Sequence, residues 1–201
     1  LTGITRHDIL NMVTVIQMIL DTVAMKFSDR ALHWYLDELR TVTGKIQNQI
    51  EFTRAYEALG LHEPVWQRVQ DLCRKLQVPD HITLHCEADD GSIYADPMFG
   101  KVFFNLLDNS VRHGQHVTEI HFSSYKDAGF WILVWEDNGT GIPLEDKDLI
   151  FDKGFGENTG LGMFLVREIL LLTGISIRET GHPGCGARFE IAIPGECWRE
   201  G

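Results

Sequence analysis

The stretch that decides the fold is NLLDNSVRHG at residues 105–114, followed by DNGTGIP at residues 137–143. Asn105 and Asn109 are four residues apart, so they lie one above the other on the same face of a helix. Asp137 follows an apolar run typical of a strand, and glycines come directly after it. Amide oxygens suit a hard cation, and glycines let a ligand approach the backbone closely. The two stretches therefore predict a pocket for a metal-bound polyphosphate and a purine.

The overall composition limits the kinds of partner. The chain has 201 residues, of which 44% are hydrophobic, and a net charge of −11. This length accommodates one ordinary domain and a smaller element. Nucleic acid and anionic membrane surfaces are bound by clustered Lys and Arg, so we expect neither as a partner. A nucleotide, which is also anionic, must then be held locally by a metal ion, backbone N–H groups and a few cations.

The cysteines and the apolar segments indicate the compartment. Four cysteines form no CxxC pair and have no histidine at ligand spacing, so we interpret them as free thiols in a reducing compartment. They are Cys73, Cys86, Cys185 and Cys197. We find no run of about 18 apolar residues, and expect no segment that spans a membrane and no direct membrane contact in this chain.

Residues 1–60 are predicted to form a hairpin of two helices. In the first helix, apolar residues occupy the a and d positions of a heptad repeat: Ile9, Val13, Ile16, Leu20, Val23 and Phe27. Ser28-Asp29 is typical of a turn and N-cap, and a second apolar stripe follows: Leu32, Leu36, Leu39, Ile46 and Ile50. A lone hairpin buries too little surface to be stable, so we expect two copies to form a dimeric four-helix bundle.

The heptad assignment places three polar residues on the outer face of the first helix. His7, Asp8 and Asn11 take positions b, c and f, with His7 and Asn11 one turn apart. Most histidines on a helix surface have no special role, so the position of His7 alone is a weak indication. Val15 and Met18 are also on this outer side, and apolar residues there indicate a surface that docks another domain.

Residues 61–201 are predicted to alternate strands and helices. The expected helices are 65–77, 97–113 and 161–172, and the expected strands are 82–87, 92–95, 116–125, 130–136, 175–180 and 187–193. We predict a two-layer α/β sandwich, in which helices cover one face of a single mixed, largely antiparallel sheet. The whole chain is thus an α plus α/β protein, with a helical hairpin at 1–60 and a nucleotide-binding domain at 61–201.

A third motif is the glycine-rich stretch GFGENTGLGMFL at residues 154–165. Its glycines precede a predicted helix whose N-terminal N–H groups and dipole would point at phosphate. Arg112 adds a guanidinium suited to phosphate oxygens, and the Asp137 carboxylate can accept from an exocyclic amine, which selects adenine over guanine. Taken singly, paired asparagines that only face water and an Asp-Asn-Gly hairpin turn are open alternatives. The three motifs in this order favour a nucleotide site.

These motifs, together with Phe151 and Phe155, resemble the ATP-binding domain of sensor histidine kinases, within the GHKL ATPase superfamily and its Bergerat-type fold. The resemblance implies that Asn109 ligates Mg²⁺, that Asn105 contacts phosphate or metal-bound water, and that Asp137 holds the adenine amine of ATP or ADP. The other nucleotide contacts that it implies are Arg112, His113, Gly139, Gly141, Ile142, Lys153, Gly154, Phe155, Gly156, Thr159, Gly160, Leu161, Gly162 and Met163.

The RHDILN stretch at residues 6–11 resembles the phosphoacceptor box of the same family's dimerisation hairpin. The resemblance implies that His7 accepts phosphate, that Asp8 orients its ring, and that Asn11 positions water for dephosphorylating a partner. The implied function is a homodimeric, ATP-dependent protein-histidine kinase that phosphorylates an Asp in a response-regulator receiver domain. The same resemblance implies a cytoplasmic location for this part of a membrane-anchored sensor.

Three departures from the family pattern change these expectations. Met12 and Val13 stand where a proline commonly follows the histidine, so any helix bending must arise differently. The lid between Phe155 and Gly160 has only four residues, from which we expect modest ATP affinity and rapid exchange. Ala187 stands where the family often has a threonine near adenine, so the water-mediated contact that the resemblance implies there is in doubt.

Two other functions remain open. One is a GHKL ATPase that hydrolyses ATP, although such enzymes carry Glu where Asn105 stands. The other is a non-enzymatic, nucleotide-dependent interaction module in which His7 is inert.

Overall fold

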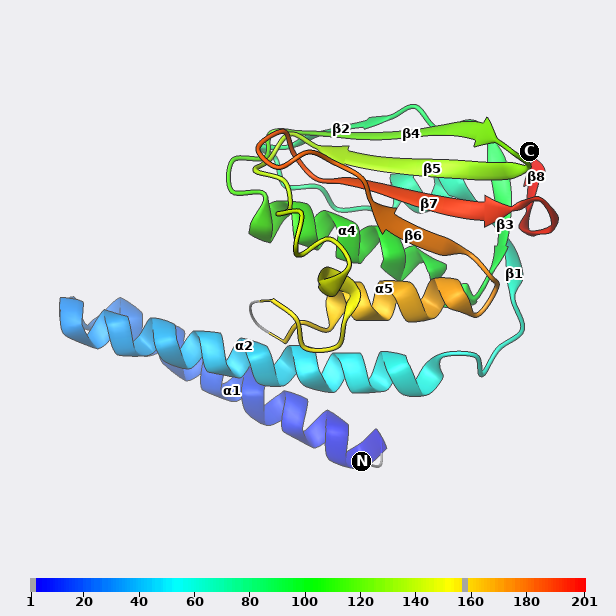
Figure 1. The fold of residues 1–201 in the computed structure, drawn as a ribbon. Helices are drawn as coiled ribbons and strands as arrows, with labels where there is room; N and C mark the ends of the chain where they lie inside the picture. The colour runs from blue at the N-terminus through cyan, green and yellow to red at the C-terminus, as the bar shows by residue number, and fades with distance from the viewer. Residues whose placement is uncertain (1–2, 157–158) are drawn as a thin grey trace. The chain divides into compact units, whose positions relative to one another are not determined.

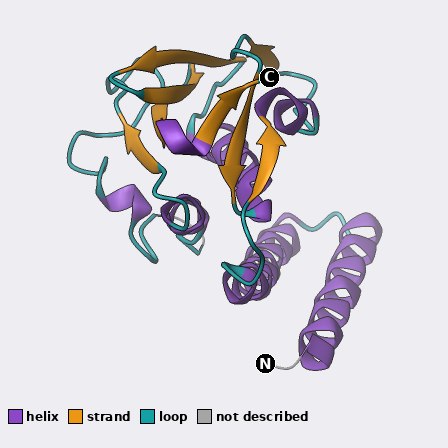
Figure 2. Cartoon of the chain, turned by 90° about the vertical axis from the view of Figure 1, so that its right-hand side faces the viewer, coloured by secondary structure: helices purple, strands orange, loops and turns teal. Residues whose placement is uncertain are grey.

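The computed structural model describes residues 3–156 and 159–201, and these fold into two compact units. The first is built on Leu1–Glu57 and the second on Ala58–Gly156 and Gly160–Gly201. Figure 1 follows the chain through both units, and Figure 2 separates helices from strands. Each unit has its own core and is described separately.

The first unit is a hairpin of two long helices, as the heptad pattern predicts. Helix α1 covers Gly3–Lys26 and α2 covers Arg30–Ala58. The predicted N-cap is confirmed at Asp29, whose Oδ1 accepts from the backbone N–H groups of Ala31 at 2.8 Å and Leu32 at 3.1 Å. At the other end of the hairpin, the Arg6 guanidinium donates to Glu57 at 2.6 Å.

Some apolar residues of each predicted stripe are buried inside this hairpin, and others are exposed. Val13 and Leu20, one heptad apart, are buried on α1, and they are matched on α2 by Leu36, Thr43 and Ile50. In contrast, Ile16 is 43% exposed and Leu39 is 50% exposed. A single copy of the hairpin therefore leaves part of the apolar surface that the heptad pattern supplies exposed.

The expectation that no segment is apolar enough to cross a membrane is wrong by the criteria of length and composition. The helical segment Thr5–Lys26 meets both criteria, because scattered polar residues interrupt the apolar run without lowering its average hydropathy far enough. A helix that packs in a soluble protein passes the same test, so this finding is a weak indication of membrane insertion.

The second unit is centred on a five-stranded sheet with the order β2-β4-β5-β7-β6. Its strands are Thr83–Cys86, Glu119–Asp127, Phe130–Asp137, Arg188–Pro194 and Ser176–Glu179. Only β2 and β4 pair in parallel, so the predicted mixed, largely antiparallel sheet is confirmed. Helices α4 (Gly100–His113) and α5 (Gly162–Leu171) lie against one face of the sheet (Figure 1), as the sandwich prediction requires. The core between these layers includes the fully buried Phe103, Leu106, Phe122 and Trp135.

The prediction of a single sheet is wrong, because a second sheet with the order β1-β3-β8 is present. Strand β1 covers Val65–Arg68, where a helix was expected. The helix α3 follows and covers only Val69–Arg74. Pairing with β3 (Gly91–Ala95) overrides the local helical pattern, and Gln67 Nε2 adds a bond to the Ala95 carbonyl at 3.1 Å. Strand β8 (Trp198–Glu200) was not predicted and completes this sheet.

The four cysteines are free thiols, as expected from their spacing. Burial, and then a hydrogen bond with Cys86, raises the pKa of the Cys73 thiol to about 12. Burial also raises the pKa of Cys197. A high pKa leaves little thiolate, which is the reactive form, so both buried residues are unreactive at neutral pH.

A buried ion pair ties the loop after β5 to β6. The Lys147 ammonium donates to Glu179 Oε2 and, at 2.5 Å, to the Gly181 carbonyl. The other Glu179 oxygen accepts from the backbone N–H groups of Gly181 and Arg188, each at 3.1 Å. The Glu179 side chain is fully buried. A carboxylate taken out of water in this way depends on all of these donors.

Lys147→Ala should therefore destabilise the second unit. Removing one partner of a buried pair leaves an uncompensated charge, and we expect the free energy of unfolding to fall by about 3–5 kcal/mol. Urea unfolding followed by tryptophan fluorescence measures this change. Lys126→Ala is the control, because its pair with Glu200 is exposed, and this variant should leave the midpoint nearly unchanged. Equal midpoints for the two variants would contradict the assigned role of Lys147.

Candidate functional site

Asp137 lies at the end of β5, is almost fully buried, and is held by three hydrogen-bond donors. Its Oδ2 accepts from Ser110 Oγ at 2.6 Å. Its Oδ1 accepts from the backbone N–H groups of Gly139 and Ala187, each at 3.0 Å. These donors come from α4, from the loop after β5, and from the residue before β7. The carboxylate therefore joins three parts of the fold that are far apart in the sequence.

Ser110 is a residue of this site that sequence reasoning missed. It is buried on α4, and its hydroxyl lies between Asp137 and Trp135, whose Nε1 donates to Ser110 Oγ at 3.2 Å. The indole N–H can only donate, so the single hydroxyl proton of Ser110 goes to Asp137. A polar side chain on the apolar face of the predicted helix was the available clue, because buried hydroxyls need partners.

Asn105 projects from α4 toward the beginning of α5, as a shared phosphate site requires. Its Nδ2 donates to the Lys101 carbonyl at 2.8 Å, which leaves Oδ1 as the outward end of the amide. A Cβ built on Gly162 would lie 2.9 Å from that Oδ1, so the side chain is close to the first residue of α5. Residue Leu161, which precedes α5, makes no side-chain cap, so the first N–H groups of this helix can bind an anion. Asn109 is one turn further along α4 and is half-buried.

The ends of the glycine-rich loop meet. Gly160 has φ +57° and accepts from Gly154 N at 3.0 Å through its carbonyl. A Cβ on Gly160 would lie 2.5 Å from the Phe155 carbonyl oxygen, so only glycine fits there. Of the predicted lid, residues 157 and 158 lie outside the described residues. Leu161 and Met163, which are expected to contact nucleotide, are buried.

Two predicted phosphate contacts have other partners in this structure. The Arg112 guanidinium donates to Asp108 at 2.6 Å, so it is already paired within α4. Both side chains are about half exposed, and such a surface pair is weak enough to be exchanged for a phosphate. The His113 side chain is exposed, and its carbonyl accepts from Thr140 Oγ1 at 3.4 Å.

Glycines make the backbone around Asp137 compact. A Cβ on Gly141, which has φ +71°, would lie 2.8 Å from the Gly186 carbonyl oxygen. Gly186 has φ +100°, and a Cβ there would overlap the Asp137 carbonyl oxygen. Gly186 was also missed from the sequence, although Gly-Cys-Gly before a strand is typical of a tight turn. Ile142, in the same loop, is half-buried.

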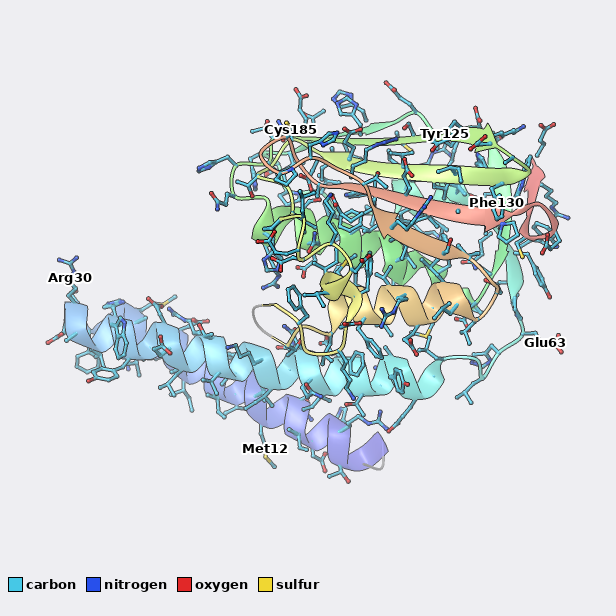
Figure 3. All side chains as sticks on the ribbon, in the orientation of Figure 1. Met12, Arg30, Glu63, Tyr125, Phe130 and Cys185 are labelled. Carbon is cyan, nitrogen blue, oxygen red and sulfur yellow. The ribbon has the colours of Figure 1, made fainter. Side chains whose placement is uncertain are left out.

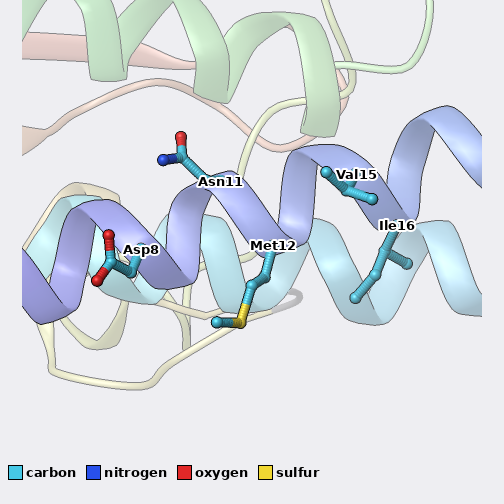
Figure 4. A pocket seen from close by; sticks show the side chains of 5 residues that line it. All are labelled: Asp8, Asn11, Met12, Val15 and Ile16. Carbon is cyan, nitrogen blue, oxygen red and sulfur yellow. The ribbon is translucent and has the colours of Figure 1, made fainter.

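In the first unit, the three predicted catalytic residues do lie together. His7 Nδ1 is 3.2 Å from Asn11 Nδ2 and 3.6 Å from Asp8 Oδ1, and the His7 side chain is 75% exposed. Figure 4 shows the groove beside them, which is lined by Asp8, Asn11, Met12, Val15 and Ile16. Figure 3 labels Met12 among the side chains that project from the hairpin. Val15 and Met18 are 49% and 56% exposed.

Comparison with known proteins agrees with this geometry. The sequence profile of the histidine kinase-, DNA gyrase B-, and HSP90-like ATPases matches residues 96–196, which is half of the chain. The chain therefore belongs to this family. The resemblance to the catalytic, ATP-binding core of sensor histidine kinases, inferred from the motifs, is confirmed.

Individual relatives are more distant and longer. The alginate biosynthesis sensor protein KinB of Pseudomonas aeruginosa is 35% identical over 102 residues, 47% of this chain and 17% of that protein. The sensor histidine kinase GraS of Staphylococcus epidermidis is 25% identical over 94% of this chain and 58% of its own length. The chain thus spans little more than half of GraS and a smaller part of KinB.

A solved structure extends the likeness in fold to nearly the whole chain. The full-length structure of ShkA in complex with AMPPNP has a TM-score of 0.66 and 17% sequence identity. The likeness covers 96% of this chain and 45% of ShkA.

Gly186→Ala should disrupt the site far more than Gly184→Ala. Both glycines have positive φ, but only the Cβ at Gly186 would overlap the Asp137 carbonyl, whereas nothing lies within 4 Å of a Cβ at Gly184. We expect Gly184→Ala to cost about 1–2 kcal/mol from backbone strain alone. Gly186→Ala should cost more and weaken binding of a fluorescent ATP analogue. Equal melting temperatures and affinities for the two variants would contradict the close packing at Gly186.

Proposed function

We propose that this chain is the catalytic part of an ATP-dependent protein-histidine kinase, which phosphorylates His7 and passes the phosphoryl group to an Asp of a response regulator. The observation that carries the proposal is the combination, in one chain, of the buried Asp137 acceptor and the exposed His7 with polar partners on its Nδ1. Family membership and the named sensor kinases among the relatives support it. Residues 1–60 would be the phosphotransfer hairpin and residues 61–201 the ATP-binding domain.

Asp137 would distinguish purines through the one hydrogen bond that its carboxylate can still accept. Gly139 and Ala187 occupy both lone-pair positions of Oδ1, and Ser110 occupies one of Oδ2. A carboxylate held in this way offers one further acceptor position and no donor. Adenine presents an amine at the 6-position and guanine presents a carbonyl oxygen, so the site favours ATP over GTP. Gly139, Gly141 and Ile142 would form the walls around the base.

The phosphates would lie between α4 and the beginning of α5. The uncapped N–H groups at Gly162 and the glycines at 154, 156 and 160 supply donors for phosphate oxygens. Lys153, Thr159 and the exposed Arg112 and His113 would add side-chain contacts. Two amide oxygens one turn apart, with that of Asn105 turned outward, fit a hard cation. Asn109 would ligate Mg²⁺ with Asn105 beside it, and the bound ion would neutralise phosphate charge.

His7 would attack through Nε2. The Asp8 carboxylate, 3.6 Å from Nδ1, favours the tautomer that carries its proton on Nδ1, and in that tautomer Nε2 is the nucleophile. Asn11 Nδ2, 3.2 Å from Nδ1, can only donate, so it would turn away from a protonated Nδ1. When Nε2 bonds to the γ-phosphorus, the bond from that phosphorus to the β,γ-bridging oxygen breaks and ADP leaves with the electron pair. The ring becomes positively charged, and the Asp8 carboxylate, 3.6 Å from Nδ1, stabilises the proton held there. Asn11 would later position water against a phosphorylated partner.

The exposed apolar residues of the predicted heptad stripes support a homodimer. Ile16, Leu39 and Ile46 are each more than 40% exposed in a single hairpin, although they belong to the predicted apolar stripes. Pairing two hairpins would bury these side chains in a four-helix bundle. A second hairpin would cover Ile16 at one side of the groove, and the part lined by Asn11, Met12 and Val15 would remain for a receiver domain.

The hydrolytic alternative is not favoured. An ATPase of this superfamily needs a general base near the γ-phosphate, and Asn105 carries an amide that cannot accept a proton. Its Nδ2 is also engaged with the Lys101 carbonyl. The relatives that align along nearly the whole chain are named as sensor kinases.

His7→Gln should abolish autophosphorylation while leaving nucleotide binding intact. The measurement is incorporation of label from γ-labelled ATP with Mg²⁺, checked for the acid lability and base stability of phosphohistidine. His33→Gln is the control, because His33 is a half-buried histidine of the same hairpin whose ring bonds its local Phe27 carbonyl at 2.8 Å. Acid-labile label on the His7→Gln protein would sink the assignment. ATP turnover without label would favour the hydrolytic alternative, and binding without either would favour the interaction module.

Ser110→Ala should weaken ATP binding through the adenine amine. Without this hydrogen bond the Asp137 carboxylate is no longer held in position for the amine, and we expect affinity to fall by about tenfold, which is about 1.4 kcal/mol. Purine riboside triphosphate, which lacks the 6-amino group, should lose much less. Ser124→Ala is the control, because that hydroxyl binds Asp89 N at 2.8 Å away from the site. Equal losses for the two nucleotides would mean that Ser110 is only structural.

A further inference from the structure

The open face of the five-stranded sheet carries a cluster that the kinase site does not use. His85 on β2 is in register with His121 on the neighbouring parallel strand β4. Glu119 is two residues before His121, so its side chain projects from the same face of β4. Between them, Ile120 is fully buried on the side of α4 and α5. The three side chains therefore share the face of the sheet that is turned away from these helices.

The cluster has the dimensions of a ligand set. The imidazole rings of His85 and His121 are stacked, with centroids 4.5 Å apart and planes inclined by 10°. His121 Nε2 is 3.8 Å from Glu119 Oε2, and one ligand atom from each residue lies within 4.8 Å of the other two. Two ligands of one tetrahedral zinc ion are about 3.3 Å apart when the bonds are about 2.0 Å. Small rotations of these side chains, two of which are about half exposed, reach that spacing.

We propose that His85, Glu119 and His121 form a binding site for a divalent transition metal ion of the zinc class. Two imidazoles and a carboxylate are the donor set that suits zinc, whereas magnesium and calcium prefer oxygen ligands alone. Three protein ligands leave one coordination position for water. Glu136 is opposite His121 on β5. Its carboxylate lies 3.8 Å from the Arg188 guanidinium, so we do not count it among the metal ligands.

At this position, a bound metal ion would stabilise the edge of the sheet. Strand β2 is an edge strand, and it joins the sheet only by pairing with β4. A metal ion held by His85 on one strand and by His121 and Glu119 on the other crosslinks this edge. The ligands are set by strand register, so the site exists only in the folded chain. Zinc should therefore raise the melting temperature of the second unit, because an ion that binds only the folded state stabilises it.

Titration calorimetry of the metal-free full chain with ZnCl₂ tests the proposal. We expect one zinc site, and each of the variants His85→Asn, His121→Asn and Glu119→Gln should weaken zinc binding by at least about tenfold. Losing a hydrogen-bond partner of a metal ligand already costs about 10–100-fold in affinity, so losing a ligand itself should cost no less. His116→Asn, which removes an exposed histidine outside the cluster, should bind zinc as the parent does. The zinc-dependent rise in melting temperature should disappear in the three cluster variants and persist in His116→Asn.

Cysteine provides the competing explanation, because Cys86 is exposed and adjacent to His85. Substitution with Co²⁺ distinguishes the two, since a His₂Glu site gives visible d–d bands without the thiolate charge-transfer band in the ultraviolet. The proposal predicts this spectrum and unchanged zinc affinity in Cys86→Ser. Loss of binding in Cys86→Ser, or parental affinity in both histidine variants, would overturn it. Neither outcome depends on kinase activity, so the metal site and the proposed function fail or stand separately.

Discussion

The buried carboxylate of Asp137 is the constraint on which the nucleotide-binding unit depends. A charged oxygen taken out of water is tolerated only when donors replace the lost hydration. Here the donors are the Ser110 hydroxyl and the backbone N–H groups of Gly139 and Ala187. Because each donor belongs to a different element, the position of α4, the loop after β5 and the beginning of β7 are fixed together. The proposed recognition of a base and the integrity of the fold would thus depend on the same atoms.

The surrounding backbone follows from that constraint. Gly186 must approach the Asp137 carbonyl, which excludes any side chain at this position and requires a positive φ. The turn that contains Gly186 is held from its other side by Glu179, which accepts from Gly181 and Arg188 and pairs with Lys147. Two buried carboxylates therefore clamp one turn between them. This arrangement would hold the proposed adenine end of the nucleotide site in place before any ligand binds.

The sequence predicted what local chemistry specifies, and missed what distant pairing decides. Apolar periodicity and turn residues predicted the main helices and the hairpin of β4 and β5, and the motifs pointed to Asp137, because each depends on short spacings. Strand β1 was expected to be helical, since VWQR has no local strand pattern and pairs only through β3. Ser110 was missed for a similar reason, because its role depends on hydrogen bonds with Trp135 and Asp137, which are 25 and 27 residues away. The grouping of His7 with Asn11 was predictable, since a single helical turn brings them together.

The two ends of the predicted nucleotide site differ in a way that suits transfer rather than hydrolysis. The base end is built from buried, mutually bonded groups and is fixed. The phosphate end is built from glycines with positive φ, an uncapped helix N-terminus, and an arginine whose surface pair with Asp108 is easily exchanged. Hydrolysis requires a base and a water held as rigidly as the purine, and Asn105 supplies neither. Transfer requires that the terminal phosphate stay accessible to a nucleophile, and His7, which is exposed on its own helix, would meet that requirement in the proposed reaction.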